Sequence, residues 1–263
     1  MRRILCIGGA VLDRKYHASK ALVPGTSNPV EGSRSFGGVA RNVAENLARL
    51  GVPTGFASIV GDDESGRALT RQLERLGVDT FNVVTSGEHP TAEYVAILGP
   101  DNDLVLGIAD MGIFDSFGPE QIDGIQPALA SASWVFADCN LPDATLAALI
   151  ASKAENGFRL AIDAVSTPKV MRLSALLAGI DLLFLNNDEG NALLGRTGPH
   201  DHLAPEETAT RLRGRGIAEV VVSMGAAGVA LATDKGVARI ASVAAQPVDV
   251  TGAGDAMIAG TLY

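Results

Sequence analysis

Near the end of the chain, two glycines and an aspartate are spaced so that they could hold an anion and assist its transfer. In the stretch PVDVTGAGDAMIAG, Gly252, Ala253 and Gly254 stand between an apolar strand and the first turn of an apolar helix. Backbone N–H groups and the positive end of the helix dipole would converge there, which favours anion binding. Asp255 could accept a proton from a hydroxyl group while this site holds the phosphate that the hydroxyl attacks. The alternative is an ordinary acidic residue in a helical first turn.

Two other phosphate-binding patterns do not fit the sequence. The chain lacks the GxxxxGK[ST] pattern of Walker-type nucleotide hydrolases. The dinucleotide pattern GxGxxG fails because Met257 stands where the third glycine would be, and no βαβ unit follows it. Neither a Walker-type hydrolase nor a dinucleotide-binding enzyme is therefore expected.

Composition limits the classes of partner. A chain of 263 residues with a formal net charge of −9 and no cluster of Lys and Arg is not expected to bind nucleic acid. No apolar stretch approaches the roughly 20 residues of a membrane span, so no membrane contact is expected. Cys6 and Cys139 both lie in apolar runs, which indicates two reduced core thiols and a cytoplasmic protein.

Apolar runs alternate with helical patterns along the chain. Buried strands are expected at 3–8, 55–60, 133–138, 159–163, 181–185 and 219–223. Helices are expected at 64–76, 119–130, 143–155, 188–194 and 205–215, and another begins after the FGG stretch and ends at Gly51. This alternation predicts an α/β fold, a three-layer αβα sandwich with a mostly parallel sheet.

The helix that ends at Gly51 shows the expected spacing. Its apolar stripe consists of Val39, Val43, Leu47 and Leu50. Its charged residues Arg41, Glu45 and Arg49 are expected to face elsewhere.

Two segments, 14–36 and 91–110, carry no helical period. In the second, TAEYVAIL and DLVLGIAD flank GPDN as the strands of a hairpin would. We expect both segments to form a small β lid over the carboxyl ends of the main strands, where open α/β sheets bind ligands. Thr91, Tyr94 and Asp110 on this hairpin are candidates for contact with a small-molecule substrate. An exposed apolar face of the lid would allow a homodimer.

Four motifs in order resemble those of the ribokinase-like (PfkB) carbohydrate kinases. GGVARNVAENLARLG and VTGAGDAMIAG are similar to the paired signatures of that family, and NNDEGNALLG and SMGAAGV fall where the family has its NxxE and nucleotide-loop motifs. The resemblance implies one ribokinase-like domain over residues 1–263. Within the family, SNP, IADM, VFADCN and AVSTPK most resemble pseudouridine kinases, which phosphorylate the 5′-hydroxyl of a free C-nucleoside.

The resemblance assigns the acceptor side of the site. Asp255 would be the base, and the backbone of Gly252, Ala253 and Gly254 would hold the charge that develops on the γ-phosphate. The remaining acceptor residues would be Asp13, Gly37, Gly38, Asn42, Asn140 and Lys169. Read singly, each of the first four has an alternative as a turn or cap residue, and a lone lysine such as Lys169 is often a solvated surface charge.

The resemblance also assigns ATP and Mg²⁺ as cofactors, and allows a monovalent cation. Asn186 and Glu189 would hold the water shell of Mg²⁺, although an asparagine cap with its Glu partner explains the pair as well. Asn186, Ser223, Gly225, Gly228 and Thr251 would contact ATP, and glycines of a hairpin loop are the alternative for SMGAAG.

Relatives in the family continue for several helices after the last motif, whereas this sequence stops at Tyr263. We expect the missing helices to cover one side of the adenine pocket, so that this chain would bind its nucleoside better than ATP. Two other functions stay open: another ribokinase-like sugar or nucleoside kinase, and a non-catalytic nucleoside-binding protein. The intact Asp255 argues against the second of these.

Overall fold

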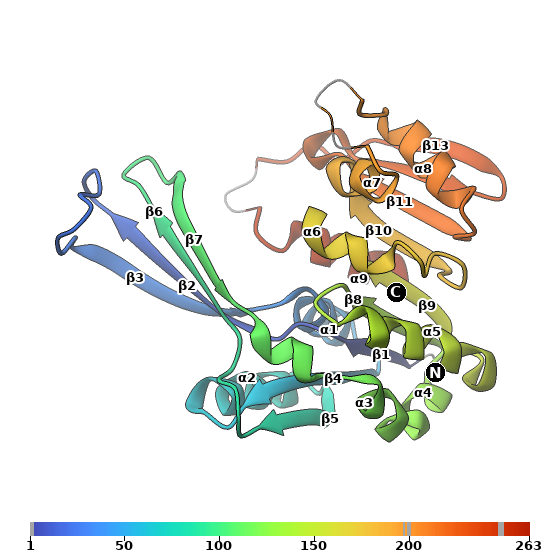
Figure 1. The fold of residues 1–263 in the computed structure, drawn as a ribbon, viewed down its shortest axis with the longest axis horizontal. Helices are drawn as coiled ribbons and strands as arrows, with labels where there is room; N and C mark the ends of the chain where they lie inside the picture. Colours follow the sequence, from blue (N-terminus) through green and yellow to red (C-terminus); the bar gives the residue numbers. More distant parts are fainter. Residues whose placement is uncertain (1–2, 197, 199–200, 247–249) are drawn as a thin grey trace.

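The computed structural model describes residues 3–196, 198, 201–246 and 250–263 and contains two β-sheets (Figure 1). The large sheet has the order β13-β12-β11-β10-β9-β8-β1-β4-β5. From β5 to β11 each strand is parallel to its neighbours, and β12 and β13 are antiparallel. Its strands are β1 (Ile4–Ile7), β4 (Thr54–Gly61), β5 (Asp79–Ser86), β8 (Trp134–Asp138), β9 (Arg159–Asp163), β10 (Leu182–Asn186), β11 (Glu219–Ser223), β12 (Val229–Thr233) and β13 (Gly236–Ile240).

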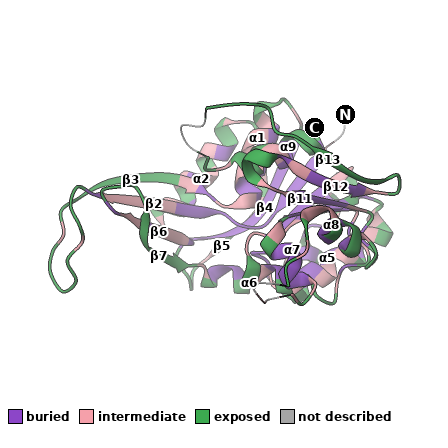
Figure 2. Ribbon diagram, turned by 90° about the horizontal axis from the view of Figure 1, so that it is seen from above, coloured by how far each residue is buried: buried purple, intermediate pink, exposed green. Residues whose placement is uncertain are grey.

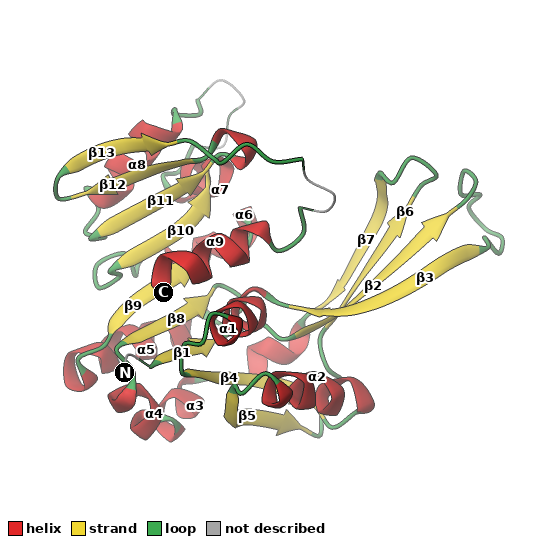
Figure 3. Cartoon of the chain, turned by 180° about the vertical axis from the view of Figure 1, so that it is seen from behind, coloured by secondary structure: helices red, strands yellow, loops and turns green. Residues whose placement is uncertain are grey.

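Helices cover both faces of this sheet (Figure 3). One layer contains α1 (Val39–Arg49), α2 (Glu64–Arg75) and α9 (Ala253–Leu262). The other contains α3 (Pro119–Gly124), α4 (Gln126–Ser131), α5 (Asp143–Asn156), α6 (Thr167–Val170), α7 (Asn187–Leu193) and α8 (Pro205–Arg213). Side chains alternate along β1: Ile4 and Cys6 pack into the first layer, and Leu5 and Ile7 into the second. The predicted three-layer αβα sandwich is confirmed.

The second sheet has the order β3-β2-β6-β7 and projects away from the body (Figures 1 and 2). Its strands are β2 (Val11–Ala18), β3 (Val30–Gly37), β6 (Glu93–Leu98) and β7 (Leu104–Asp110). The predicted hairpin is present, because β6 and β7 pair antiparallel and Gly99 N–H donates to the carbonyl of Asp103 in the connecting turn. We call this sheet the lid sheet.

The structure differs from the expectations in three strands and two helices, of which the short α6 was not predicted at all. The strands β5, β12 and β13 were not predicted. β5 is a half-exposed edge strand, β12 alternates buried and half-buried residues, and every residue of β13 is exposed. None of the three is a continuous buried apolar run. The helix expected over 119–130 is two helices that meet at Ile125. Pro127 lies in the first turn of α4, and its missing N–H group prevents an unbroken helix there.

The apolar stripe of α1 is only partly as expected. Val43 and Leu47 are buried, but Leu50 is exposed and Arg41, which was expected to face elsewhere, is 4% exposed. A guanidinium group tolerates such burial only when it is hydrogen-bonded, and the partners of Arg41 are described below.

The last helix rests on the first. Ile258, Ala259 and Leu262 of α9 are buried in the same core cluster as Val43 and Leu47 of α1. The short helix that carries the glycine motif is therefore held by tertiary packing, which supplies most helical stability in folded proteins.

Both cysteines are buried free thiols, and burial raises the pKa of each. They belong to the core, as the sequence predicts. Across the residues that the structure describes, none of the helices has the length and apolar character needed to span a bilayer.

Candidate active site

The glycine motif opens α9 through a left-handed turn. Gly252 is the N-cap with φ of 76°, a conformation that glycine adopts without steric cost. Ala256 N–H donates to the carbonyl of Gly252, so Asp255 lies in the first helical turn. A Cβ atom at Gly254 would meet nothing within 4 Å, so the space beside this residue is open. Residues 247–249 of the strand predicted to precede this turn lie outside the described residues.

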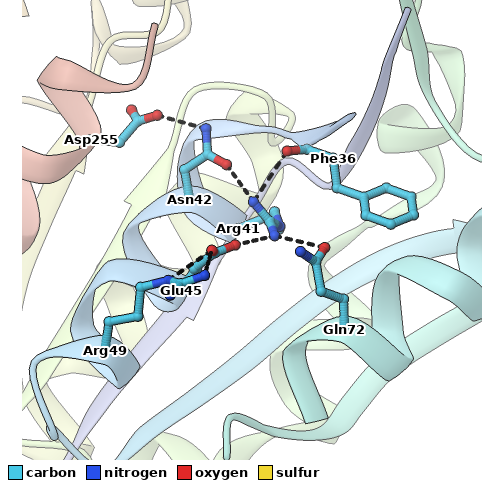
Figure 4. Close-up of polar contacts among 7 residues, drawn as sticks. All are labelled: Phe36, Arg41, Asn42, Glu45, Arg49, Gln72 and Asp255. Atoms are coloured by element: carbon cyan, nitrogen blue, oxygen red, sulfur yellow. Dashed lines mark hydrogen bonds and ion pairs between the residues drawn. The ribbon is translucent and has the colours of Figure 1, made fainter. Parts of the chain in front are cut away.

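Asp255 is held by Asn42, 213 positions earlier in the chain (Figure 4). Asn42 Nδ2 of α1 donates to Asp255 Oδ2 at 2.7 Å. No hydrogen bond from another described residue reaches Oδ1, so this oxygen is available to accept a proton. Burial raises the pKa of Asp255, while the Asn42 hydrogen bond opposes that rise. A carboxylate with a raised pKa is a better proton acceptor.

Asp13 and the glycine pair meet where the lid sheet joins the body. A Cβ atom at Gly37 would lie 2.0 Å from a carboxylate oxygen of Asp13, so only glycine leaves room for that side chain. Gly38 has φ of 96°, and a Cβ atom there would lie 2.3 Å from the carbonyl oxygen of Gly9. Burial raises the pKa of Asp13. The structure therefore places Asp13, Gly37 and Gly38 together, as predicted.

Asp138 is a site residue that the sequence analysis missed. It ends β8, is fully buried, and accepts N–H groups from Gly9 at 2.9 Å, Ala40 at 2.8 Å and Asn140 at 2.9 Å. Burial raises its pKa, and these three donors oppose that rise. The carboxylate thereby fixes the turn after β1, the start of α1 and the residue that follows β8. The sequence did contain a signal for Asp138, because it ends the apolar run that predicts a buried strand at 133–138.

Asn140 and Lys169 lie side by side. Lys169 Nζ on α6 donates to Asn140 Oδ1 at 2.5 Å. Burial lowers the pKa of Lys169, and the carboxylate of Asp138 opposes that effect. Lys169 is half-buried and paired, so the alternative of a solvated surface charge does not describe it.

The three lid residues are not brought together. Thr91 is buried, its N–H and hydroxyl groups donate to Asp63 at 2.7 and 2.8 Å, and its oxygen accepts from Gly61 N–H. These bonds tie the start of β6 to the N-cap of α2, and a substrate contact for Thr91 stays a prediction.

Tyr94 and Asp110 lie on opposite faces of the lid sheet. Tyr94 pairs with Asp13 across β2 and β6 and shares its face. Asp110 pairs with Glu93, the neighbour of Tyr94 in β6, and so lies on the other face. Tyr94 therefore shares a face with Asp13 and Asp110 does not, and a substrate contact for either residue stays a prediction.

The expected magnesium residues form a helix cap. Asn186 Oδ1 accepts from Glu189 N–H at 2.9 Å, and Glu189 Oε2 accepts from Asn186 N–H at 2.7 Å. This is the capping-box alternative. Burial raises the pKa of Glu189. Within the described parts of the chain, no three His, Cys, Asp or Glu side chains could hold a metal ion. These residues therefore fit Mg²⁺ only through water, and that role stays a prediction.

Asp163 is a second carboxylate that the sequence analysis did not single out. It ends β9, pairs with Asp138 across β8 and β9, and accepts from Val165 N–H at 2.8 Å. Burial raises its pKa well above the usual range, and the nearby carboxylates of Glu189, Asp138 and Asp255 raise it further.

The nucleotide-loop residues surround a tight turn. Ser223 ends β11 beside Asn186 of β10. The turn Gly225–Ala227 follows, with Gly225 at φ of 57° and Gly228 at φ of 95°. A Cβ atom at Gly228 would lie 2.0 Å from the carbonyl oxygen of Ile240. Close backbone approach thus requires glycine here. These residues do connect two antiparallel strands, which was the alternative interpretation.

Thr251 lies directly before the glycine turn, within reach of the lid sheet. Lys15 Nζ of β2 is 3.5 Å from Thr251 Oγ1. The anion motif and the lid sheet are therefore neighbours at this point, and an ATP contact for Thr251 stays a prediction.

The chain is similar to known proteins over its whole length. The description pfkB family carbohydrate kinase matches residues 1–263. A pseudouridine kinase of Escherichia coli (strain K12) is 30% identical over 261 residues, which cover 98% of this chain and 82% of that protein. A solved carbohydrate kinase from Agrobacterium tumefaciens has a TM-score of 0.86 and 33% identity, covering 100% of this chain and 83% of the other. Arabidopsis thaliana ribokinase complexed with ribose and ATP shares the fold, with a TM-score of 0.85, 24% identity, and coverage of 98% and 83%.

The family match covers residues 1–263, which include the glycine motif and both sheets. The chain therefore belongs to the PfkB family of carbohydrate kinases, and it is a phosphotransferase with an alcohol group as acceptor.

Proposed function

We propose that this protein transfers the γ-phosphoryl group of ATP to the 5′-hydroxyl of a nucleoside, with pseudouridine as the first substrate to test. The observation that carries the proposal is the position of Asp255, which lies in the first helical turn after the left-handed Gly252 and accepts a hydrogen bond from Asn42. The similarity to a pseudouridine kinase supports the choice of nucleoside.

In the proposed reaction, the carboxylate of Asp255 takes the proton of the acceptor hydroxyl. The hydroxyl oxygen forms a bond to the γ-phosphorus, the bond between that phosphorus and the β,γ-bridging oxygen breaks, and ADP leaves. The N–H groups of Gly252, Ala253 and Gly254 would face the charge on the transferring group. Lys169 could neutralise part of the same charge, because its ammonium group is half-buried near the strand ends.

The acceptor sugar would lie over the joint between the lid sheet and the body. Asp13 can accept two hydrogen bonds from vicinal hydroxyls, and Asn140 can donate and accept. Gly37 and Gly38 would offer backbone groups to the sugar, and their lack of side chains leaves room for Asp13 and for the Gly9 carbonyl. Tyr94, on the face of the lid sheet that carries Asp13, is the candidate for contact with the base.

The nucleotide would lie along the ends of β10 and β11. The turn at Gly225 and Gly228, with Ser223, Asn186 and Thr251 beside it, would accept the phosphates and ribose of ATP. When bound, Mg²⁺ would supply charge neutralisation on the phosphates, and Asn186 and Glu189 would hold it through its water shell. A monovalent cation remains part of the proposal without an assigned site.

A panel of nucleosides and sugars in an ADP-release assay tests the proposal. Turnover with pseudouridine that exceeds turnover with ribose and with other nucleosides supports it. Turnover of ribose or fructose with none of pseudouridine would agree with phosphotransferase activity but overturn the choice of pseudouridine as acceptor. Nucleoside binding by calorimetry without any ATP turnover would favour the non-catalytic alternative.

A further inference from the structure

Arg41 is a buried cation that joins three elements to the base (Figure 4). Its Nη1 donates to the carbonyl of Phe36 at 3.1 Å and to Asn42 Oδ1 at 2.8 Å. Its Nη2 donates to Gln72 Oε1 at 2.9 Å and forms an ion pair with Glu45. Phe36 lies in the lid strand β3, Gln72 in α2, and Glu45 one turn further along α1.

The contact with Asn42 decides which end of that amide faces Asp255. A carboxamide has an oxygen that only accepts and a nitrogen that only donates. Because Arg41 donates a hydrogen bond to Oδ1, the nitrogen is the end that points to the carboxylate of Asp255. If the amide were reversed, its oxygen would face the carboxylate and both hydrogen bonds would be lost.

We propose that Arg41 is a positioning residue that holds the Asn42 amide in the orientation that donates to Asp255 and links this orientation to the end of lid strand β3. The inference rests on the proposed function, in which Asp255 is the base. Its basis is the unbroken chain of hydrogen bonds from the Phe36 carbonyl through Arg41 and Asn42 to Asp255.

Electrostatics support the same role. The charged groups that act on Asp255 come from four elements: Arg41 on α1, Asp13 on β2, Asp138 on β8 and Asp163 on β9. The carboxylates of Asp138 and Asp13 raise the pKa of Asp255, whereas the Arg41 cation and the Asn42 hydrogen bond lower it. Loss of Arg41 should therefore raise this pKa further.

The first experiment compares Arg41→Lys and Arg41→Gln with the wild type. Lysine keeps the charge but cannot donate in the planar geometry that reaches Phe36, Asn42 and Gln72 together. We expect kcat to fall about tenfold in both variants, with KM for ATP changed less than about twofold. In Arg41→Gln, the acid limb of the kcat–pH profile should also move to higher pH. An unchanged pH profile in Arg41→Gln would overturn the proposal, even if kcat were lower.

Arg49→Gln is the matched control. Arg49 is on the same helix and forms hydrogen bonds to the same Glu45, but its side chain is 58% exposed and it makes no contact with Asn42. We expect its kcat and pH profile to match the wild type. An equal loss in Arg49→Gln would show that Glu45 or general helix stability, rather than the Asn42 contact, causes the effect, and would overturn the proposal.

Chemical rescue separates positioning from packing. Arg41 lines a cavity of about 620 Å³ together with Arg34, Ser65 and Gln72, so a small cation can reach its place. Guanidinium at low millimolar concentration should restore a large part of the kcat that Arg41→Ala loses. Rescue by guanidinium but not by equimolar sodium supports the proposal. If neither ion restores kcat in a variant that keeps the wild-type Tm, the proposal is overturned.

A carboxyl ¹³C NMR titration tests the inference without turnover. The Asp255 resonance, assigned by its loss in Asp255→Asn, should titrate at higher pH in Arg41→Gln than in the wild type. An equal titration midpoint in the two proteins would contradict the inference. If the wild type transfers no phosphate to any acceptor, the proposed function fails, while this titration still decides whether Arg41 acts on Asp255.

Discussion

The two halves of the candidate site are built in different ways. The acceptor half consists of side chains from distant segments, with Asp13, Asn42, Asp138 and Asp255 brought together by four elements. The nucleotide half consists mainly of backbone, because its central feature is the turn at Gly225 and Gly228. The proposed acceptor half thus fixes the positions of charged side chains, whereas the conformation of the proposed nucleotide half depends on residues that have no side chain.

This difference suggests that the acceptor half serves proton transfer and the nucleotide half serves phosphate binding. Proton transfer needs a carboxylate at one place, and the acceptor half holds such a group by a hydrogen bond of 2.7 Å. Phosphates can be held by N–H groups that every residue supplies, so the nucleotide half needs glycine more than a particular functional group. Substitutions in the acceptor half should accordingly change activity by altering charge. Substitutions in the nucleotide half should change it by altering the backbone conformation.

The largest effect is expected from Asp255→Asn, in the acceptor half. We expect kcat to fall by roughly 10²-fold or more while KM for the acceptor changes little, because a general base contributes mainly in the transition state. Steady-state kinetics with the acceptor identified in the panel measure both quantities. Equal losses in acceptor affinity and in rate would make Asp255 a binding residue and weaken the contrast between the halves.

The second prediction concerns shape in the nucleotide half. Gly228→Ala places a Cβ atom 2.0 Å from the Ile240 carbonyl oxygen in a left-handed conformation, so we expect a loss of about 2 kcal/mol or more in unfolding free energy. KM for ATP should rise at least about tenfold, in line with a loss of this size in the binding turn. Urea unfolding and kinetics measure the two effects.

Gly225→Ala is the control for this prediction. Its φ of 57° is also left-handed, but a Cβ atom there meets nothing within 4 Å. Only the backbone cost of about 1 kcal/mol is expected. If both variants lost the same stability, close approach at Gly228 would not be the reason for its glycine.

The third prediction concerns Asp163, whose buried carboxyl has a pKa raised well above its usual range. The folded protein holds this proton more tightly than the unfolded chain does. Stability is therefore lost as pH rises above the unfolded pKa of about 3.9. Asp163→Asn avoids this cost, and we expect its Tm at pH 8 to exceed that of the wild type by about 2–4 °C.

Thermal unfolding from pH 4 to pH 8 measures this difference, which should shrink toward pH 4. The control is Asp62→Asn, at a side chain that is 69% exposed, where no gain is expected. A lower Tm for Asp163→Asn at pH 8 would show that the ionised carboxylate stabilises the fold.

The smallest effect is expected from Glu189→Gln, which asks whether the helix cap has a second role. Glutamine can still accept from Asn186 N–H, so the capping box and the Tm should be kept. If the Glu189 charge also holds the water shell of Mg²⁺, the Mg²⁺ concentration for half-maximal rate should rise about threefold, roughly 0.6 kcal/mol. An unchanged Mg²⁺ requirement would mean that Asn186 and Glu189 serve only as a helix cap.

The sequence predicted the layers of the fold because they follow from local periodicity. The strands at β1, β8, β9 and β11 are short buried apolar runs, and the helices between them have an apolar stripe. The edge strands β5 and β13 lack that signal because solvent reaches them. Pro127 was a local signal for two helices instead of one, and it was not used.

Candidate site residues were named where a sequence motif contains them. Residues that come together only through the tertiary structure were not recognised. Asp255 and Asn42 were each expected in the site, but no pattern showed that they bind one another across 213 positions. Arg41 was assigned away from the core because charge at a helical spacing usually marks a solvated face. Its burial depends on acceptors supplied by β3 and α2, which the sequence does not place.

The carboxylate of Asp138 also bears on the order in which the chain folds. It binds N–H groups of residues 129 and 98 positions away, so its contacts close two of the longest loops in the acceptor half. Such nonlocal contacts form only after the entropy of loop closure has been overcome, which makes them late events on a folding route. The hydrogen bonds of Asp138 to Gly9 and Ala40 should therefore be absent from partly folded chains, and nascent chains would acquire them only when β8 has paired with β1.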